Sequence, residues 1–318
     1  MKKSLLFFLF LILIIVISAS YTLSSWDSNK ESIEVNIAIT ENFGRELVQE
    51  NAVTVSSGSS ALDALKSVSQ IETKYGGNFV TSINGIKSGF PEDHYDWFFY
   101  VNGFLAKEGA SSYIIRNGDS IQWDYHNWES EYHQSAIIGD YPKYFINGYG
   151  GNKSPTIIVF ENEFLDEASK LRGRLFNEYK INVTMKSIET ISVDEKSKSN
   201  VIILAKSNND IVKELNEIQS KIGFNAYFEN NALIEMDCRS KTYNEYDKAG
   251  VIQITQNIWN PKGNRACENV ILLISGTDTE SIKNSANVLI EDFSGYRYSF
   301  GLIITENKSV KIPYCYEE

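Results

Sequence analysis

The stretch 96–123, DWFFYVNGFLAKEGASSYIIRNGDSIQW, decides the fold of the N-terminal part of this chain. It begins with a run of four aromatic residues, Trp97 to Tyr100, and aromatic residues favour β-strands. Asn102 and Gly103 follow, and Asn-Gly is the dipeptide that most strongly indicates a two-residue hairpin turn. The first half of the stretch therefore predicts an aromatic strand that turns back on itself.

The second half of the stretch predicts another turn and another strand. Asn117-Gly118-Asp119 is a turn signal, and Ile121 and Trp123 then alternate with polar residues. Together the two halves predict two or three short strands with tight turns and an unusually aromatic face.

The order of these elements resembles the C-terminal β-domain of transcobalamin and intrinsic factor, and the microbial family of unknown function grouped with that domain. The shared order is a W-x-x-Y strand, a glycine-containing turn, a G-(A/I)-x-x-Y segment and a G-(D/E)-x-I segment. In this chain these lie at 97–100, 103, 109–113 and 118–121, within a resemblance that covers about 33–126. The resemblance implies that the domain covers or holds a small ligand, with a corrinoid as the candidate.

Residues further upstream extend the resemblance to the β-grasp fold. Residues 33–40 alternate as a first strand, and 52–56 are typical of a second. The turn 57–60 offers hydroxyl N-caps for a helix, and apolar residues from Ala61 to Ile71 share one face of it, with Gly76-Gly77 as its stop. A hairpin, a helix across it and further strands is the β-grasp order.

Four rings and two turn residues are the candidate ligand-binding residues of this domain. Rings stack on flat ligands, and turns present amides and oxygens to a polar rim. The candidates are Trp97, Tyr100, Tyr113, Trp123, Asn102 and Asp119. The alternative interpretation is core packing, because aromatic residues also fill the buried face of a sheet. Strand periodicity places Trp97 and Phe99 opposite Phe98 and Tyr100, so the helix covers one face and another element covers the second.

The N-terminus, residues 1–25, predicts a signal peptide or an uncleaved membrane anchor. Lys2 and Lys3 precede the uncharged apolar run 5–17, which is shorter than the roughly 20 residues of a full membrane span. We therefore expect an extracytoplasmic protein, either secreted or held at the cytoplasmic membrane by this segment.

The composition indicates an exported globular protein with two cores. A net charge of −11 does not favour nucleic acid or anionic lipid surfaces, which recruit basic clusters. The expected domains are a transcobalamin-like β-grasp domain at 30–126 and an α/β domain at 153–318. The aromatic connecting segment 127–152 is too rich in tyrosine for a flexible linker, so we expect it to pack across the domain junction.

The cysteines and histidines leave few chemical options open. Cys238, Cys267 and Cys315 allow one disulfide with one leftover thiol, or three reduced cysteines, and their spacing does not fit a zinc site. His126 and His133 lie among acidic residues, but their spacing matches no metal-ligand pattern. We therefore expect no metal and no cofactor.

The C-terminal domain is predicted to be an α/β three-layer sandwich. Uninterrupted apolar runs at 156–160, 201–205, 270–275 and 299–305 are typical of strands buried on both faces. Their alternation with helices favours a largely parallel sheet, and the predicted helices lie at 165–179, 211–222 and 279–293.

Smaller features complete this prediction. We expect a hairpin within 225–237, a weak helix at 243–249, and a cap for the last helix at Thr277 or Asp278. The segments GVIQITQNIWNPKG and ENVILLISGTD resemble parts of archaeal cell-surface and S-layer-associated proteins.

No catalytic residues are expected. The chain has no G-x-S-x-G elbow, no H-E-x-x-H and no cysteine with an evident partner histidine. The leading hypothesis is an exported or membrane-anchored, non-enzymatic binding protein for a small ligand. The alternative is a cell-surface structural or adhesion protein whose two domains contact other proteins. A pocket would favour the ligand hypothesis, and a flat exposed aromatic patch would favour the adhesion hypothesis.

Overall fold

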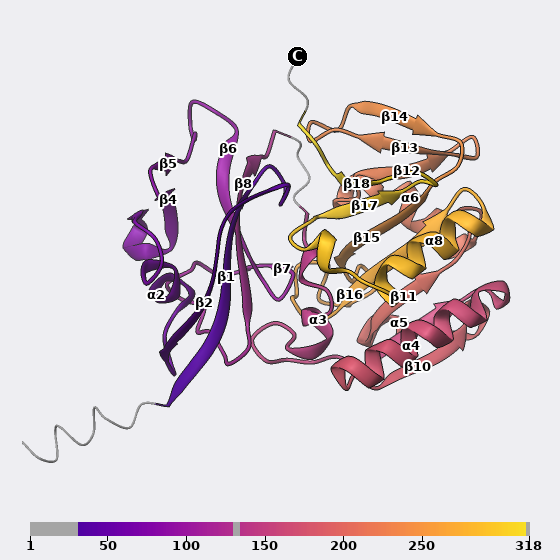
Figure 1. The fold of residues 1–318 in the computed structure, drawn as a ribbon, viewed down its shortest axis with the longest axis horizontal. Helices are drawn as coiled ribbons and strands as arrows, with labels where there is room; N and C mark the ends of the chain where they lie inside the picture. Colours follow the sequence, from indigo (N-terminus) through magenta and orange to yellow (C-terminus); the bar gives the residue numbers. More distant parts are fainter. Residues whose placement is uncertain (1–30, 130–133, 316–318) are drawn as a thin grey trace, which may run out of the picture.

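The chain folds into a mixed α+β structure with several sheets, described here from a computed structural model of residues 31–129 and 134–315 (Figure 1). The predicted leader, residues 1–25, and His133 lie outside the described residues. Within the described residues, none of the helices combines the length and apolar character needed to cross a membrane.

A five-stranded mixed sheet forms the N-terminal part. Its order is β2-β1-β8-β6-β7, and only the central β1 and β8 pair in parallel. The strands are β1 (Ser32–Glu41), β2 (Glu46–Ser56), β6 (Tyr95–Val101), β7 (Phe104–Leu105) and β8 (Ser120–Asn127). The hairpin turn between β6 and β7 is Asn102-Gly103, as predicted, and both residues have positive φ.

A short helix and a small sheet complete this part. The helix α2 (Ala61–Lys66) is capped by the side chain of Ser60, which accepts from the backbone N–H of Asp63. The sequence predicted apolar helix positions up to Ile71, but that residue begins β3 (Ile71–Lys74). A three-stranded antiparallel sheet follows, which β3 forms with β4 (Phe79–Ile83) and β5 (Ile86–Lys87).

The aromatic strand β6 has two covered faces. Trp97 and Phe99 belong to the hydrophobic cluster that contains the leucines of α2, and Phe99 stacks on Trp123 of β8 with 4.8 Å between ring centroids. Tyr100 faces the other way, where its ring meets the edge of Phe300 at 5.2 Å. The helix covers one face, and the C-terminal part of the chain covers the other.

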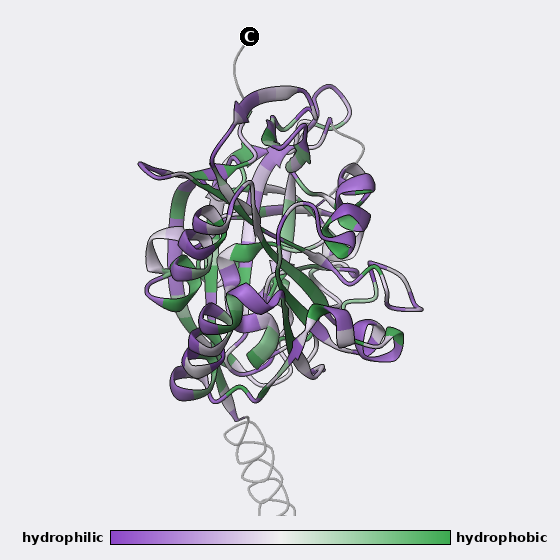
Figure 2. Ribbon diagram, turned by 90° about the vertical axis from the view of Figure 1, so that its right-hand side faces the viewer, coloured by the Kyte–Doolittle hydropathy of each residue, from purple (hydrophilic) through white to green (hydrophobic). Residues whose placement is uncertain are grey.

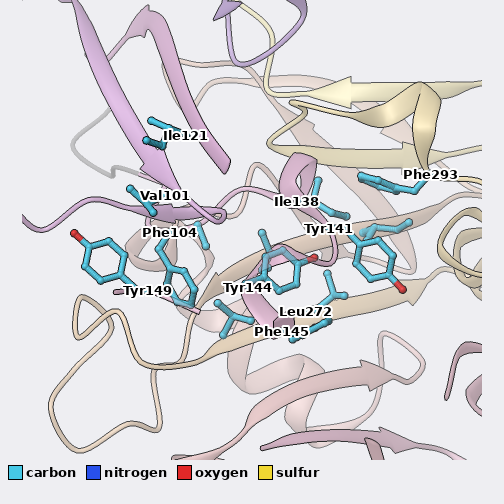
Figure 3. Packing of buried hydrophobic residues seen from close by; sticks show 14 of the residues in the cluster. Val101, Phe104, Ile121, Ile138, Tyr141, Tyr144, Phe145, Tyr149, Leu272 and Phe293 are labelled. Carbon is cyan, nitrogen blue, oxygen red and sulfur yellow. The ribbon is translucent and has the colours of Figure 1, made fainter. Parts of the chain in front are cut away.

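The connecting segment lies between the two large sheets (Figures 1 and 3). It contains the 3-10 turn η2 (Ile138–Asp140) and the helix α3 (Lys143–Ile146). In Figure 3 the ring of Tyr144 lies between Val101 of β6 and Leu272 of the second sheet. One hydrophobic cluster therefore runs from the first sheet through this segment into the second.

The second large sheet has seven strands in the order β10-β9-β11-β16-β15-β17-β18. The first four pair in parallel and the last three are antiparallel, so the sheet is less parallel than predicted. The strands are β9 (Thr156–Phe160), β10 (Val183–Ser187), β11 (Asn200–Leu204), β15 (Gly250–Gln256), β16 (Val270–Gly276), β17 (Gly301–Ile304) and β18 (Ser309–Ile312). Figure 2 shows hydrophobic residues along the central strands and hydrophilic residues on the outer helices.

Helices cover both faces of this sheet. On one face lie α4 (Leu165–Tyr179) and α8 (Thr279–Ile290), whose apolar side chains join the first cluster. On the other face α6 (Asp210–Glu217) and α7 (Gln219–Ile222) pack against the opposite sides of β9, β11 and β16. Asp278, one of the two predicted cap residues, caps α8 because its side chain accepts a hydrogen bond from the N–H of Ser281. The remaining short helices are α5 (Val193–Lys198), η1 (Tyr75–Gly77), η3 (Asn162–Phe164), η4 (Ile188–Thr190) and η5 (Ser294–Tyr296).

The helix predicted at 243–249 is wrong, because most of this segment belongs to a second three-stranded sheet. The segment contains β14 (Thr242–Tyr246), which pairs with β13 (Ala232–Met236), and β13 pairs with β12 (Ala226–Glu229) in the predicted hairpin. Thr and Tyr favour strands, and pairing with β13 outweighs the weak helical spacing. The predicted helix 211–222 is likewise two helices, because the backbone leaves helical geometry at Ile218.

The cysteines adopt the first of the two predicted arrangements. Cys238 and Cys315 form a disulfide that joins the loop after β13 to the end of the described chain. Cys267 is a buried free thiol, and burial raises its pKa to about 11.

Candidate functional site

The six residues proposed from the sequence as ligand-binding all lie in the interior of the N-terminal part. None of these side chains is more than 6% exposed. A ligand in contact with them would have to displace packed neighbours. Their burial therefore favours the core-packing interpretation, and their ligand-binding role stays a prediction.

Three of the six meet in one hydrogen-bond network. The side-chain amide of Asn102 donates to Asp119 Oδ1 and to the carbonyl of Gly148, both at 2.8 Å. The hydroxyl of Tyr113 donates to Asp119 Oδ2 at 3.2 Å. Burial raises the pKa of Asp119, although the bonds from Asn102, Arg116 and Tyr113 act in the opposite direction. The network ties the β6–β7 turn to the connecting segment.

The other three support the sheets from inside. Trp97 donates its indole N–H to the carbonyl of Ile86 in β5 at 3.1 Å, so it holds the small sheet against the large one. Tyr100 donates to the carbonyl of Gln134 at 3.3 Å. Trp123 stacks on Phe99, and its indole nitrogen is buried without a hydrogen-bond partner among the described residues.

A hollow of about 530 Å³ lies on the outer side of the small sheet. Its walls come from β3, β4, β5, the loop before β6 and the first residues of β6. The apolar lining consists of Tyr75, Phe79, Phe90 and Pro91. None of these residues was among the ligand-binding candidates proposed from the sequence.

Two of the rings lining the hollow are largely exposed to solvent. Tyr75 is 80% exposed and Phe90 is 60% exposed, while Phe79 is half-buried. Tyr75, Gly76 and Gly77 have φ values of 52°, 68° and 92°, all in the left-handed region. Left-handed backbone strains Tyr75 but suits the two glycines, and this turn leaves the Tyr75 ring at the surface.

Charged side chains surround the apolar part of the hollow. Lys74 and Lys87 contribute positive charge, and Glu72 and Asp96 contribute negative charge. Asp96 is buried, and burial raises its pKa, while hydrogen bonds from Ser88 and the backbone of Trp97 act in the opposite direction. The hollow thus combines aromatic surface with polar groups of both signs, which is the usual make-up of a small-molecule site.

The sequence did contain a signal for this hollow. Tyr75 directly precedes Gly76-Gly77, and Phe90 stands between Gly89 and Pro91. Large rings beside turn residues lie where a chain reverses at the surface. From the sequence, the Gly-Gly pair was predicted only to end a helix.

The structure describes His126, one of the two histidines that the sequence places among acidic residues. His126 is buried on β8, and its Nδ1 lies 2.6 Å from Asp124 Oδ1. The imidazole stacks between the rings of Phe43 and Phe98, each with 4.4 Å between centroids. Across residues 31–129 and 134–315, no group of three or more His, Cys, Asp and Glu residues is arranged to hold a metal ion.

Comparisons with known proteins match the N-terminal part of the chain. Residues 58–127, which include the lining of the hollow, match the model of a protein family described as a domain of unknown function (DUF4430). None of the curated proteins matches the chain.

Two solved structures show weak likenesses to the chain. Haptocorrin in complex with Cbi is 21% identical with a TM-score of 0.26, over 31% of this chain and 26% of haptocorrin. A putative metal binding protein from Ruminococcus gnavus is 13% identical with a TM-score of 0.24, over 30% of this chain and 97% of that protein. At these TM-scores neither likeness identifies a ligand for this chain.

Proposed function

We propose that this chain is an exported, non-enzymatic binding protein that holds a small ligand with a flat ring system, and that a corrinoid is the first candidate. The observation that carries this proposal is the pair of exposed rings, Tyr75 and Phe90, in the 530 Å³ hollow. Of the six interior residues proposed from the sequence, Trp97 supports this site, because its hydrogen bond to Ile86 holds β5 against the large sheet.

The physical chemistry of the hollow suits such a ligand. Its volume falls in the range of about 300–1,000 Å³ that is typical of ligand pockets. Stacking on an aromatic ring contributes about 0.5–1.5 kcal/mol per contact beyond burial. The lysines Lys74 and Lys87 and the acids Glu72 and Asp96 offer partners of both signs to polar groups at the edge of the ring system. A corrinoid is larger than this hollow, so one face of it would remain accessible.

The proposal includes a β-grasp-like arrangement for the N-terminal part and a sandwich for the C-terminal part. The hairpin of β1 and β2, the helix α2 and the parallel pairing of β1 with β8 support the first. Helices on both faces of the seven-stranded sheet support the second.

The extracytoplasmic location remains part of the proposal. The Cys238–Cys315 disulfide supports it, because disulfides persist mainly in oxidising compartments. Protease treatment of intact cells tests it. Cleavage of residues 153–318 is the expected result, and full protection of them would contradict export.

Fluorescence titration of the purified protein with cobalamin tests the ligand proposal. The Trp128 ring lies 6.3 Å from Phe90, so an occupant of the hollow is expected to quench its emission to saturation. Tyr75→Ala and Phe90→Ala should each weaken binding about 2- to 10-fold, the equivalent of one stacking contact. Phe176→Ala is the matched control, because this ring is 52% exposed on α4, away from the hollow.

Two outcomes would contradict the proposal. Saturable binding that is undiminished in both Tyr75→Ala and Phe90→Ala would remove the hollow from the site. An absence of saturation with cobalamin would exclude the corrinoid. In that event, self-association or binding to cell-surface protein that is lost in the same two variants would favour the adhesion hypothesis.

A further inference from the structure

Three tripeptides of the form Asn-x-Ser/Thr occur in the chain, at 152–154, 182–184 and 307–309. This tripeptide is the acceptor for N-linked glycans in exported proteins, and a glycan is a bulky group that needs a free surface. All three asparagines are exposed. The surroundings of the second tripeptide nevertheless differ from those of the other two.

The second tripeptide is the one whose polar groups are free. The hydroxyl of Ser154 donates to a backbone carbonyl at 2.8 Å, and the hydroxyl of Ser309 accepts from a tyrosine at 2.9 Å. Among the described residues, none forms a hydrogen bond with the side chain of Asn182 or of Thr184, which is also exposed. The folded surface therefore presents both the amide and the hydroxyl of this acceptor.

The local backbone fixes the position of this acceptor. It begins in the short loop between α4 and β10, at the outer side of the second large sheet (Figure 1). Lys180 ends α4 with a φ of 58°, and the N–H of Ile181 donates back to the carbonyl of Leu175 at 3.0 Å. Ile181 is buried and anchors the loop, while the next residue, Asn182, is exposed.

A hollow of about 490 Å³ lies directly beside the acceptor, and Asn182 and Thr184 line it. The ring of Phe176 on α4 also lines it and is 52% exposed. Gly173 lines it one helical turn earlier, and a Cβ at that position would meet no atom within 4 Å. Glycine in a helix interior is less stable than alanine. The hollow therefore combines an acceptor amide, an exposed ring and open space that the helix keeps at a cost in stability.

We infer that Asn182 carries an N-linked glycan and that the first sugar of this glycan lies in the hollow against the ring of Phe176. The donor is a sugar chain linked to a polyprenyl phosphate. Nδ2 of Asn182 bonds to C1 of the sugar, and the bond between C1 and the phosphate oxygen of the donor breaks. The lipid-linked phosphate leaves, and Nδ2 releases one proton. The inference rests on the proposed extracytoplasmic location, because this transfer takes place outside the cytoplasm.

The chemistry of the hollow suits a sugar. The C–H face of a sugar ring packs on an aromatic ring, and Arg172 and Asn177 in the lining offer donors to its hydroxyl groups. The volume lies within the range of about 300–1,000 Å³ that small ligands occupy. The glycan would also shield β10, which is an edge strand of the sheet, from pairing with another chain.

Expression of the full chain behind the secretion signal of a eukaryotic host tests the site. Peptide mass spectrometry of the protein recovered from cells and medium should show a glycan on Asn182. Asn182→Gln and Thr184→Ala should each abolish this glycan, and Thr184→Ser should retain it. Asn307→Gln is the matched control, since it changes another exposed acceptor and should leave Asn182 modified. An unmodified Asn182, with or without glycans at the other two sites, would overturn the inference.

Thermal unfolding tests the position of the first sugar. Trimming the glycan with an endoglycosidase that leaves the first sugar should keep Tm nearly unchanged, whereas complete removal should lower Tm by about 2 °C or more. In Phe176→Ala the loss on complete removal should be less than half as large. Leu165→Ala is the control, because this side chain is equally exposed on α4 but does not line the hollow. Equal losses in Phe176→Ala and Leu165→Ala would overturn the placement of the sugar.

These outcomes are separate from the test of the location. The host's signal imposes export, so an unmodified Asn182 there contradicts the acceptor site itself. Protection of residues 153–318 from protease in intact cells contradicts the location alone. The cobalamin titration is independent of both, because none of the residues that line the aromatic hollow lines this one.

Discussion

Two aromatic regions of the N-terminal part differ in what their rings do. The strands β6 and β8 carry a dense aromatic run, and Trp97, Tyr100 and Trp123 are almost fully buried there. The hollow beside β3–β5 has fewer rings, but Tyr75 and Phe90 stand in solvent. Aromatic density along a strand therefore marks the core, whereas rings displayed beside turns mark a surface available to a ligand.

The strongest test of the core role of the first region is to truncate one of its rings. Trp123→Ala removes a side chain that is 2% exposed and stacked on Phe99, so it leaves a large cavity. We expect the free energy of unfolding to fall by about 3–5 kcal/mol, as for other buried aromatic residues. Urea unfolding at pH 7 measures this loss. A decrease below about 1 kcal/mol would show that this face is not a packed core.

The interior also contains a group whose burial is costly, and its cost depends on pH. The pKa of Asp140 is about 6 in the folded protein, against an ordinary value of 3.8. A raised carboxyl pKa means that the folded state holds the proton more tightly. Protonation of Asp140 therefore stabilises the folded state fully below pH 4, and this stabilisation is lost as the pH rises through 6.

Asp140→Asn should remove that dependence. At about 1.4 kcal/mol per pKa unit, the wild-type protein should lose up to about 3 kcal/mol relative to the variant between pH 4 and pH 7. Arg297, a cation near Asp140, remains charged throughout this window, and the hydroxyls of Tyr144 and Tyr298 remain protonated, because the pKa of each of these three groups is raised. Urea unfolding of both proteins at pH 4, 5, 6 and 7 gives the difference, and parallel curves would contradict the assignment. Asp166→Asn, on an exposed carboxylate, is the control.

Much of the fold follows from local sequence patterns. The helix at Leu165–Tyr179, the strand at Thr156–Phe160 and the turn at Asn102-Gly103 were predicted because their periodicity or turn chemistry is strong. The strands at Val183–Ser187 and Ser309–Ile312 were missed, because both are sheet edges with partly exposed side chains. An edge strand is defined by its neighbour more than by its own sequence.

The candidate sites were harder to predict than the fold. Aromatic residues have the same sequence signature in a core and in a pocket, so Trp123 could not be separated from Tyr75 without knowing which face each covers. One hollow, where the two large sheets meet, is lined by Asp140, Arg174 and Arg297, which are far apart in the sequence and meet only through the packing of the two sheets. No local pattern encodes that meeting.

A smaller effect separates a buried turn from an exposed one. Asn102 and Asn84 both precede a glycine and have φ near 50°, so replacement by alanine strains both turns alike. Asn102 also donates to Asp119 and Gly148 in the interior, whereas Asn84 is exposed. Asn102→Ala should therefore cost about 1–3 kcal/mol more than Asn84→Ala, the cost of unpaired buried groups. Thermal and urea unfolding of both variants give the difference, and equal losses would show that the network contributes nothing.

The smallest effect on stability is expected at the aromatic hollow, where stability and ligand binding should respond differently to the same substitution. Tyr75→Ala and Phe90→Ala remove rings that are mainly in solvent, so each should change the free energy of unfolding by no more than about 0.5 kcal/mol. The same variants should weaken cobalamin binding, whereas Trp123→Ala acts on stability first. Urea unfolding and fluorescence titration of the same preparations test both halves of this statement. A loss of 2 kcal/mol or more in Tyr75→Ala or Phe90→Ala would mean that these rings support the fold, and the two regions would then differ in exposure without differing in role.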